Sequence, residues 1–267
     1  MRAVGVRDEP RTQAPLERRV APIVANEEVG AYRLLRASDA AGPEPRPGQF
    51  YMVAAADRWG GGQGERPYLP RAFSHARRLP DGSLEFLLEA IGPGTDRLAE
   101  LREGDGLALL GPLGIGFRPP PEGRQPLLVG GGIGTAPLLC LRDELGDCQV
   151  LLGFRSAAFA EAARLFPGEV ALATDDGTAG RAALVTDLLR ERLSAESLVY
   201  ACGPPPMLEA VRALCAERDV PAQLALESGM ACGFGACFGC VVPTREGYIR
   251  LCVEGPVLDA EAMDVVR

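Results

Sequence analysis

The sequence predicts a multidomain α+β chain with an antiparallel β-barrel first, a parallel-sheet α/β domain second, and a short cysteine-bearing segment last. Short β-type runs with turn signals and no long helix fill residues 17–120, as in barrels. Strands then alternate with helices over 125–225, which favours a parallel sheet. Four cysteines fall in 226–267. Residues 1–16 are polar and rich in Pro and Arg, so we expect a disordered tail there.

The barrel elements follow from β-type runs that end in glycine, proline or aspartate. The stretch Trp59–Gly64 is expected to be a flexible loop, and Asp96–Leu101 a short helix. The expected strands are Val20–Val24, Ala31–Leu35, Gln49–Ala54, Leu84–Ala90 and Gly106–Leu110.

A proline-rich linker, 118–123, separates the barrel from the α/β domain. In that domain, apolar runs of strand length alternate with longer periodic stretches. The expected strands are Pro126–Val129, Gln149–Phe154, Val170–Thr174 and Leu198–Ala201. One helix is expected to begin near Ala136. The other expected helices are Ala157–Phe166, Leu184–Leu193 and Pro206–Arg218.

The composition excludes several functions. The 267 residues carry a net charge of −8, so the basic footprint of a nucleic-acid-binding protein is missing. All 28 basic residues are arginine, which rules out Schiff-base and Walker-type lysine chemistry. There is no apolar run of about 18 residues, and the N-terminus lacks a signal-peptide core, so we expect no membrane span and a cytoplasmic location.

The four cysteines near the C-terminus are the most specific signal. Their spacing, C-x4-C-x2-C-x11-C, begins like the plant-type [2Fe–2S] ferredoxin pattern. Intervening glycines let the backbone approach an anionic cluster closely. A zinc site or unligated thiols are the alternatives, but only one CxxC pair is present and the single histidine is remote in sequence. The predicted iron ligands are Cys232, Cys237, Cys240 and Cys252.

Two strand-to-helix junctions in the α/β domain are candidates for nucleotide binding. The run Gly130–Pro137 is glycine-rich at a point where a helix begins, which suits a pyrophosphate, although it departs from strict GxGxxG and could be a tight turn. The run Cys202–Met207 likewise ends a strand and opens a helix; a structural junction with a buried Cys202 is the alternative. Asp175–Gly177, beyond a predicted strand, is expected to be a turn, with contact to the nucleotide as the alternative.

Two short motifs in the barrel region are compatible with phosphate binding. Arg71–Ser74 offers a cation, an aromatic ring and a hydroxyl within four residues. Gly94-Thr95 follows a strand and could be a second phosphate cradle, or a helix start with Thr95 as its cap. His75 adjoins the first motif and is expected to be a solvated loop histidine.

Together these motifs resemble the ferredoxin–NADP reductase superfamily over about residues 19–260. Within it, the chain is most similar to the electron-transfer subunits of class 1B, NAD-dependent dihydroorotate dehydrogenases. The cysteine segment and the closing Cys252–Val257 run, which resembles C-x-x-G-P-V, carry this resemblance.

The resemblance implies a flavin-binding barrel and a nicotinamide-binding α/β domain. Arg71 would meet the FAD pyrophosphate and Ser74 the edge of the isoalloxazine, while Ala72 stands where the family has proline. The implied FAD residues are Arg71, Ala72, Phe73, Ser74, Leu87, Leu88, Glu89, Gly94 and Thr95. The implied nicotinamide-nucleotide residues are Gly130, Gly131, Gly132, Gly134, Thr135, Cys202, Gly203 and Pro204.

The implied function is electron transfer from a dihydroorotate-oxidising flavoprotein subunit, through a [2Fe–2S] cluster and FAD, to NAD+ in pyrimidine (UMP) biosynthesis. A flavin belongs between a hydride carrier and a one-electron cluster because it handles both. No catalytic acid or base is expected in this chain, and two copies would assemble with two catalytic subunits. The alternatives are a reductase subunit of a sulfite reductase or hydrogenase, and a zinc protein on an inactive reductase scaffold. The choice between NAD and NADP stays open.

Overall fold

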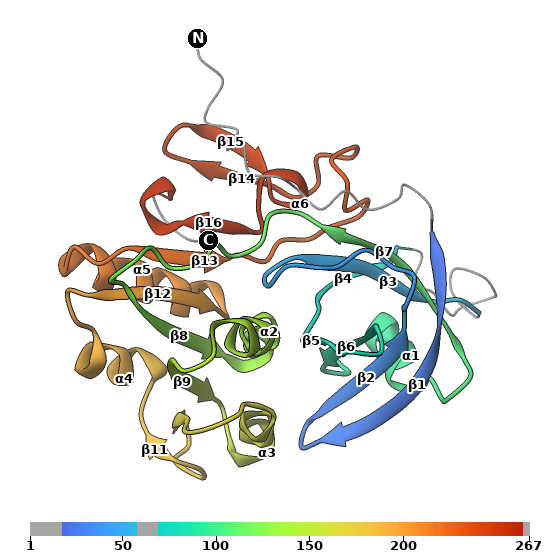
Figure 1. Cartoon of the computed structure of the whole chain (residues 1–267), viewed down its shortest axis with the longest axis horizontal. Coiled ribbons are helices and arrows are strands. Elements are labelled where there is room, and N and C mark those ends of the chain that lie inside the picture. Colours follow the sequence, from blue (N-terminus) through green and yellow to red (C-terminus); the bar gives the residue numbers. More distant parts are fainter. Residues whose placement is uncertain (1–17, 58–68, 264–267) are drawn as a thin grey trace.

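The computed structural model describes residues 18–57 and 69–263. In Figure 1 the barrel lies beside the α/β domain, and the C-terminal segment lies above both. The tail predicted at 1–16 and the loop predicted at Trp59–Gly64 fall outside the described residues. The predicted fold class is confirmed: an antiparallel β-domain is followed by a parallel-sheet α/β domain and a cysteine-bearing segment.

The barrel is one seven-stranded antiparallel sheet in the order β4-β3-β7-β1-β2-β6-β5. Its two edge strands, β4 and β5, are separated in the chain by only His75 and Ala76, so the sheet must curl back on itself. The short helix α1 (Pro93–Ala99) follows β6. The strands are β1 (Arg19–Val29), β2 (Tyr32–Ser38), β3 (Phe50–Ala55), β4 (Arg71–Ser74), β5 (Arg77–Arg78), β6 (Ser83–Leu88) and β7 (Gly106–Leu113).

The α/β domain is built on a second seven-stranded sheet, β11-β10-β9-β8-β12-β13-β16. All its pairs are parallel except β13–β16. The strands are β8 (Gln125–Gly131), β9 (Gln149–Phe154), β10 (Ala171–Thr174), β11 (Arg181–Ala182), β12 (Ser197–Cys202), β13 (Ala222–Ala225) and β16 (Val257–Asp259). The connecting helices are η1 (Gly132–Thr135), α2 (Ala136–Leu145), α3 (Ala157–Ala160), η2 (Glu161–Leu165), α4 (Val185–Arg192) and α5 (Pro205–Glu217).

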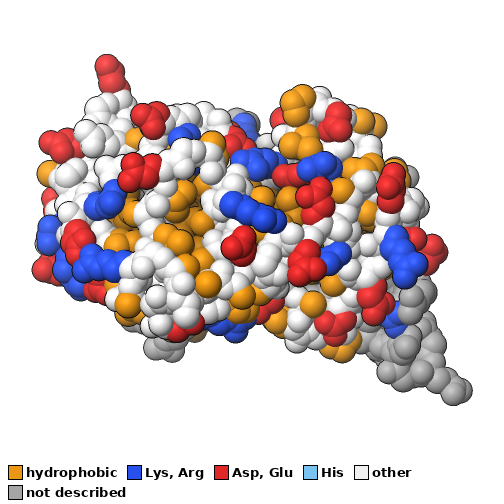
Figure 2. Space-filling model, turned by 90° about the horizontal axis from the view of Figure 1, so that it is seen from below, with side chains coloured by type: hydrophobic (Ala, Val, Ile, Leu, Met, Phe, Trp, Pro, Cys, Tyr) orange, Lys and Arg blue, Asp and Glu red, His pale blue; other side chains and the backbone are white. Residues whose placement is uncertain are grey.

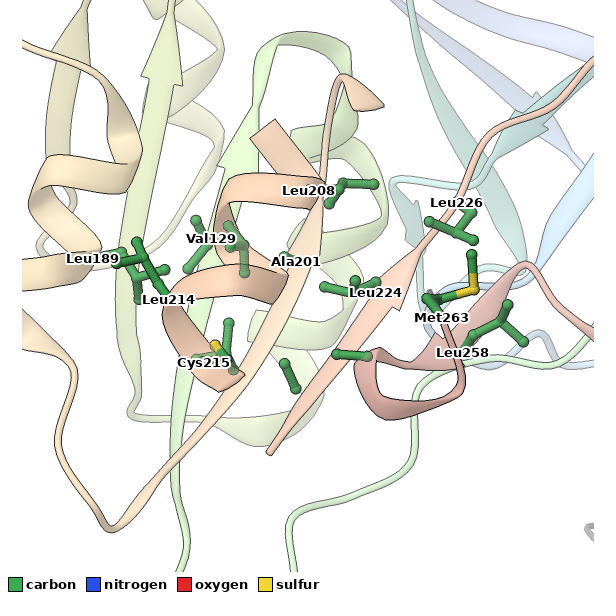
Figure 3. Close-up of a cluster of buried hydrophobic side chains, with 14 of the residues drawn as sticks. Val129, Leu189, Ala201, Leu208, Leu214, Cys215, Leu224, Leu226, Leu258 and Met263 are labelled. Atoms are coloured by element: carbon green, nitrogen blue, oxygen red, sulfur yellow. The ribbon is translucent and has the colours of Figure 1, made fainter. Parts of the chain in front are cut away.

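Both faces of this sheet are covered, because successive residues of its central strands point to opposite sides. Val129 belongs to the apolar cluster that includes α4 and α5, whereas Leu128 belongs to the one that includes α2 and α3. Figure 3 shows Leu208 and Leu214 of α5 close to the strand side chains, and the cluster extends to Met263 beyond β16. The C-terminal segment is thus packed into the same core.

The C-terminal segment contains the hairpin β14 (Val241–Thr244) and β15 (Gly247–Arg250), the single turn α6 (Leu251–Glu254), and η3 (Ala260–Ala262). Its strand β16 pairs antiparallel with β13, and an isolated bridge joins Pro256 to Ile115 after the barrel. This segment therefore contacts both the barrel end and the nucleotide-binding sheet, which fixes the position of the cysteine loop that precedes the hairpin.

Three local predictions were wrong. His75 is only 2% exposed, because it lies at the turn between β4 and β5, where the sheet curls over it. Helix α1 begins at Pro93, so Thr95 lies inside its first turn and is not the cap. Strand β6 ends at Leu88, which leaves Glu89 and Ala90 beyond it.

The surface mixes charges of both signs. Seen from below in Figure 2, acidic and arginine side chains are interspersed around apolar side chains in the middle of that face. Within 18–57 and 69–263, no helix is long and apolar enough to cross a bilayer.

Candidate functional site: two adjoining pockets and a cysteine loop

The first cavity, about 360 Å³ and here called the barrel pocket, opens where the barrel, the α/β domain and the C-terminal segment meet. Ile133 and Pro137 contribute from the α/β domain, and Leu226 to Ser228 and Met230 from the C-terminal segment. Most of the residues predicted to bind FAD line it from the barrel side; Leu88 instead packs into the barrel core. The predicted FAD residues that line the barrel pocket are Arg71, Ala72, Phe73, Ser74, Leu87, Glu89, Gly94 and Thr95.

Arg71 and Gly94 form the cationic corner of the barrel pocket. Arg71 donates from Nη1 to the carbonyl of Leu69 at 2.7 Å, which orients its guanidinium. A Cβ on Gly94 would lie 2.7 Å from the Arg71 Nε, so a larger residue there would displace the guanidinium from this position. A cation held against the backbone of a glycine-containing turn suits the pyrophosphate of a dinucleotide such as FAD.

Thr95 shapes the turn beside this corner. Its hydroxyl accepts hydrogen bonds from the backbone N–H groups of Ile91 and Gly92, at 2.9 and 3.1 Å, and donates to the carbonyl of Gly92. The side chain is thus used to hold the backbone of the Gly92–Gly94 turn, which lines the pocket. The residues present therefore fit FAD.

The second cavity, about 800 Å³ and here called the strand-end pocket, lies at the carboxyl ends of β8, β9 and β12. Strand β8 lies between β9 and β12, so this is the point where the strand order reverses, the usual place for a nucleotide in such sheets. The predicted residues Gly131, Gly132, Gly134, Gly203 and Pro204 line it.

The other three predicted nucleotide residues lie beneath the strand-end pocket. A Cβ on Gly130 would meet the side chains of Leu152 and Thr135, and Thr135 is itself buried. Cys202 is buried at the end of β12. Burial, and then the nearby Glu227 carboxylate, raise the pKa of the Cys202 thiol well above its usual value, so it stays a neutral packing group.

Met207, from the candidate run Cys202–Met207, and Asp175, from the expected turn, also line the strand-end pocket. The structure adds residues that sequence reasoning missed, Tyr32, Arg155 and Phe159. Arg155 directly follows β9, and Asp175 directly follows β10, so their positions at strand ends were a usable signal. Tyr32 belongs to the barrel, and no local motif connects it with the nucleotide site.

Glu227 was also missed, and it lines both pockets. The residue keeps solvent-exposed surface, and partial loss of water contact raises the pKa of its carboxyl group. Glu89, Ile91 and Ile133 are shared in the same way. The two cavities are therefore adjoining parts of one site, with the carboxyl groups of Glu89 and Glu227 at their junction.

The four predicted iron ligands come together in one loop and the turn α6, as two pairs of thiols. The side chains of Cys232 and Cys237 contact each other, and so do those of Cys240 and Cys252. The N–H groups of Gly239 and Cys252 point at the sulfurs of Cys237 and Cys240, at 3.4 and 3.5 Å.

Two pairs are what two bridged irons require, since each iron takes two protein ligands. Across the described ranges, no three His, Cys, Asp or Glu side chains gather as a single metal ion would need.

Gly233 has φ of +80° and a Cβ there would lie 2.4 Å from Cγ of Met52, so the loop needs glycine to lie against β3. Burial by itself would raise the pKa of the Cys232 thiol. Hydrogen bonds from backbone N–H groups of the loop outweigh that effect and lower the pKa to about 6, which favours the thiolate. The residues present therefore fit a [2Fe–2S] cluster.

Comparison with known proteins agrees with this geometry. The model of the iron–sulfur cluster binding domain of dihydroorotate dehydrogenase B matches residues 227–264, which include all four cysteines. The electron transfer subunit of dihydroorotate dehydrogenase B (NAD(+)) from Caldanaerobacter subterraneus is 38% identical over 226 residues, covering 82% of this chain and 87% of that protein. The chain belongs to this family of electron transfer subunits. The member from Bacillus caldolyticus is 41% identical, over 80% of this chain and 85% of its own.

Solved structures support the family's fold in this chain. The NADH-dependent reduced ferredoxin-NADP oxidoreductase, studied for flavin-based electron bifurcation, superposes with a TM-score of 0.76 at 25% identity, covering 92% of this chain and 90% of that one. The ferredoxin reductase of carbazole 1,9a-dioxygenase gives a TM-score of 0.63 at 23% identity, covering 76% and 66% of the two chains. The second likeness concerns the fold alone.

Proposed function

We propose that this chain is the oxidoreductase subunit that carries electrons between a dihydroorotate-oxidising flavoprotein subunit and NAD+, with FAD and a [2Fe–2S] cluster as its redox groups. Its place is in pyrimidine biosynthesis. The observation that carries the proposal is the order of the three sites. The strand-end pocket adjoins the barrel pocket, and Met230 of the barrel pocket lies two residues before Cys232.

The contact between the barrel pocket and the cysteine loop is also made across the sheet. Gly233 lies against Met52 of β3, and Met52 pairs with Ala72 of β4, which lines the barrel pocket. The cluster and the flavin would therefore be separated by one strand pair and not by a domain. Short separations of this kind favour electron transfer without a moving part.

The chain's own residues bind and orient. Arg71 and the Gly92–Gly94 turn would hold the FAD phosphates, and the glycines at the end of β8 would hold the nicotinamide nucleotide. Bound FAD supplies the exchange between a hydride and single electrons. Glu227 of the C-terminal segment and Glu89 of the barrel each present a carboxyl group to both pockets.

The partner would dock where the cysteine loop is open to solvent. Cys237 is exposed, the adjacent Phe238 is 63% exposed, and Tyr248 of the following hairpin is 78% exposed, which is unusual for such large rings. The Arg250 guanidinium lies over the Phe238 ring, 5.2 Å from its centroid. An aromatic and arginine surface beside an electron-carrying group is suited to a protein partner. We propose two of these chains with two catalytic subunits, in the cytoplasm, where thiols stay reduced.

The test is a coupled assay. The chain is purified anaerobically, combined with the catalytic dihydroorotate dehydrogenase subunit of the same organism, and supplied with dihydroorotate and NAD+. We expect NADH to form only when both chains are present. Replacing Phe238 with serine should weaken the complex, whereas serine at Val20, an exposed residue of β1, should not.

Failure of the coupled assay with intact FAD and iron would contradict the dihydroorotate assignment. The same preparation would then be offered the catalytic subunits of sulfite reductase and hydrogenase complexes. NADH-dependent reduction of one of those would establish the alternative partner, and the redox role of the chain would stand.

A further inference from the structure

Tyr32 is a barrel residue that reaches the strand-end pocket of the other domain. It is the first residue of β2 and follows the turn that ends β1. That turn contacts the α/β domain, where the backbone N–H of Ala31 donates to the carbonyl of Ala158 in α3 at 2.9 Å; Figure 1 shows the turn beside α3. Tyr32 is only 1% exposed, yet it lines the pocket. The barrel therefore supplies a buried phenol to a pocket formed at the ends of the α/β strands.

The ring of Tyr32 is held in place by its neighbours. It meets the Phe159 ring edge to face, with centroids 5.4 Å apart and planes at 77°. The Arg155 guanidinium lies over the same Phe159 ring, with its Cζ 3.6 Å from the centroid. The charge of Arg155 is in turn paired with the Glu89 carboxylate of the barrel. This stack fixes the direction of the Tyr32 hydroxyl, and the arginine in it is already matched by an acid.

The hydroxyl of Tyr32 makes no hydrogen bond across the described residues. The buried Tyr200 hydroxyl, by contrast, donates to a backbone carbonyl at 2.9 Å. The Tyr51 hydroxyl is also unpaired, but it is sealed in the barrel core, whereas that of Tyr32 is open to the pocket. Burial, and then the Glu89 carboxylate, raise the pKa of Tyr32, so the phenol keeps its proton at physiological pH. It therefore offers an unused donor to a ligand in the pocket.

The Tyr32 hydroxyl faces the glycine-rich turn at the end of β8. Gly132 begins η1 there, with φ of +55°. A Cβ built on Gly132 would lie 3.9 Å from the Tyr32 hydroxyl oxygen, the nearest described atom outside the turn. The space between the phenol and the turn is therefore open, with room for a ligand oxygen. Glycine turns at the end of such a strand hold the pyrophosphate of a dinucleotide.

We propose that Tyr32 is a ligand-binding residue of the strand-end pocket, whose hydroxyl donates to a phosphate oxygen of the nicotinamide dinucleotide held on the Gly131–Gly134 turn. This inference rests on the proposed use of the pocket by NAD(H). A hydrogen bond from a neutral donor to an anionic oxygen is of the strong, charge-assisted kind. The donor comes from the barrel and the turn from the α/β domain. The bound pyrophosphate would therefore join the domain that holds the flavin to the domain that holds the nucleotide.

The test compares ADP-ribose, which carries the pyrophosphate but no nicotinamide, with adenosine, which carries no phosphate. Dissociation constants for the FAD-loaded chain are measured by calorimetry, adenosine by displacement of ADP-ribose, so no electron transfer is required. Tyr32→Phe removes the hydroxyl and keeps the ring against Phe159. We expect ADP-ribose to bind this variant about tenfold more weakly, because a charge-assisted hydrogen bond is lost. The constant for adenosine should change by less than about twofold.

Tyr200→Phe is the matched control. It removes another buried tyrosine hydroxyl, on β12, which bonds a backbone carbonyl and does not line the strand-end pocket. Binding of ADP-ribose to this variant should equal that of the native chain.

A second measurement follows the Tyr32 hydroxyl directly in the native chain. The chain has five tyrosines, so labelling their Cζ atoms with carbon-13 gives few signals, and the one missing from Tyr32→Phe belongs to Tyr32. ADP-ribose should shift this signal because the attached oxygen gains a hydrogen bond, whereas adenosine should leave it in place.

Several outcomes would overturn the inference. It fails if Tyr32→Phe binds ADP-ribose as tightly as the native chain, or if Tyr200→Phe weakens that binding equally. Equal weakening of adenosine would mean that the hydroxyl shapes the pocket without contacting phosphate. FAD content is recorded for each variant, and if Tyr32→Phe loses FAD, a Tyr32 signal unmoved by ADP-ribose overturns the inference by itself.

Failure of this inference can be told apart from failure of the proposed function. A native chain that does not bind ADP-ribose contradicts both. A native chain that binds ADP-ribose and passes electrons from dihydroorotate to NAD+, with no effect of Tyr32→Phe on ADP-ribose, contradicts only the role of Tyr32. The expected weakening in a chain that passes no electrons from dihydroorotate contradicts only the proposed function.

Discussion

Arg77 of the barrel strand β5 clamps the two domains together through Asp143 of α2. Its Nε and Nη2 donate to the two carboxylate oxygens at 2.5 and 3.3 Å, and Nη2 also donates to the carbonyl of Leu165 at 2.7 Å. Together with the Glu89–Arg155 pair, this gives two described ion pairs between the barrel and the α/β domain. Both domains supply walls of both pockets, so these pairs help to maintain the site.

Replacing Arg77 with alanine should lower the free energy of unfolding by about 1–2 kcal/mol, more than an exposed ion pair, because a forked and partly buried contact is lost. Chemical denaturation of the FAD-loaded chain measures this. Alanine at Arg181, whose pair with Glu191 is exposed on both sides, is the control and should lower the free energy of unfolding much less than alanine at Arg77. Equal effects of the two substitutions would contradict the clamp.

His75 should remain neutral through the physiological range. Burial lowers its pKa to about 4, although its contact with the carbonyl of Gln49, at 3.3 Å, acts in the opposite direction. Because it is the only histidine, its imidazole signal in an NMR titration is unambiguous. We expect no titration of that signal between about pH 5.5 and 8. A midpoint near the ordinary value of about 6.5 would contradict the buried position.

The same shift predicts a pH-dependent stability. Below about pH 6.5 the unfolded chain takes up a proton at His75 that the folded chain refuses until about pH 4. The free energy of unfolding should therefore fall as the pH is lowered through this window, by up to about 3 kcal/mol from this group. In His75→Gln this part of the pH dependence should be absent, whatever the substitution does to stability at pH 8.

Serine in place of Cys237 should remove most of the cluster. We expect the broad visible absorbance and the iron content, about two per native chain, to be lost. FAD should be retained, because Cys237 does not line the barrel pocket. Serine at Cys148, a partly buried thiol outside the cysteine loop, is the control and should keep both. Zinc in the native chain, with normal zinc content in the Cys148 variant, would argue for the zinc alternative.

Glutamine in place of Arg71 should weaken FAD binding about ten- to a hundredfold, because a hydrogen-bonded charge on the pyrophosphate contributes about 1.5–3 kcal/mol. Fluorescence titration of the deflavinated chain measures the affinity. Glutamine at Arg190, in an exposed pair with Asp187 on α4, is the control. An unchanged affinity in Arg71→Gln would show that the phosphates lie elsewhere in the barrel pocket.

Much of the molecule follows from local pattern. Turn-bounded β-type runs predicted the barrel, and alternating strands and helices predicted the parallel sheet; Gln149–Phe154 was expected and found as β9. The cysteine spacing identified four residues that do lie together in one loop and α6. Such features are readable because backbone preference and ligand spacing act over a few neighbouring residues.

Other features were settled by contacts between segments remote in sequence. Whether His75 is solvated depends on how the sheet curls between β4 and β5, and the loop composition carried no sign of it. Glu227, Tyr32 and the Glu89–Arg155 pair enter the site only because two domains and the C-terminal segment meet there. The sequence alone therefore determined most of the elements and predicted the cofactor ligands. The tertiary structure decided which charges face each other across the nucleotide pocket, because Coulomb interactions depend on distance in space and not on separation along the chain.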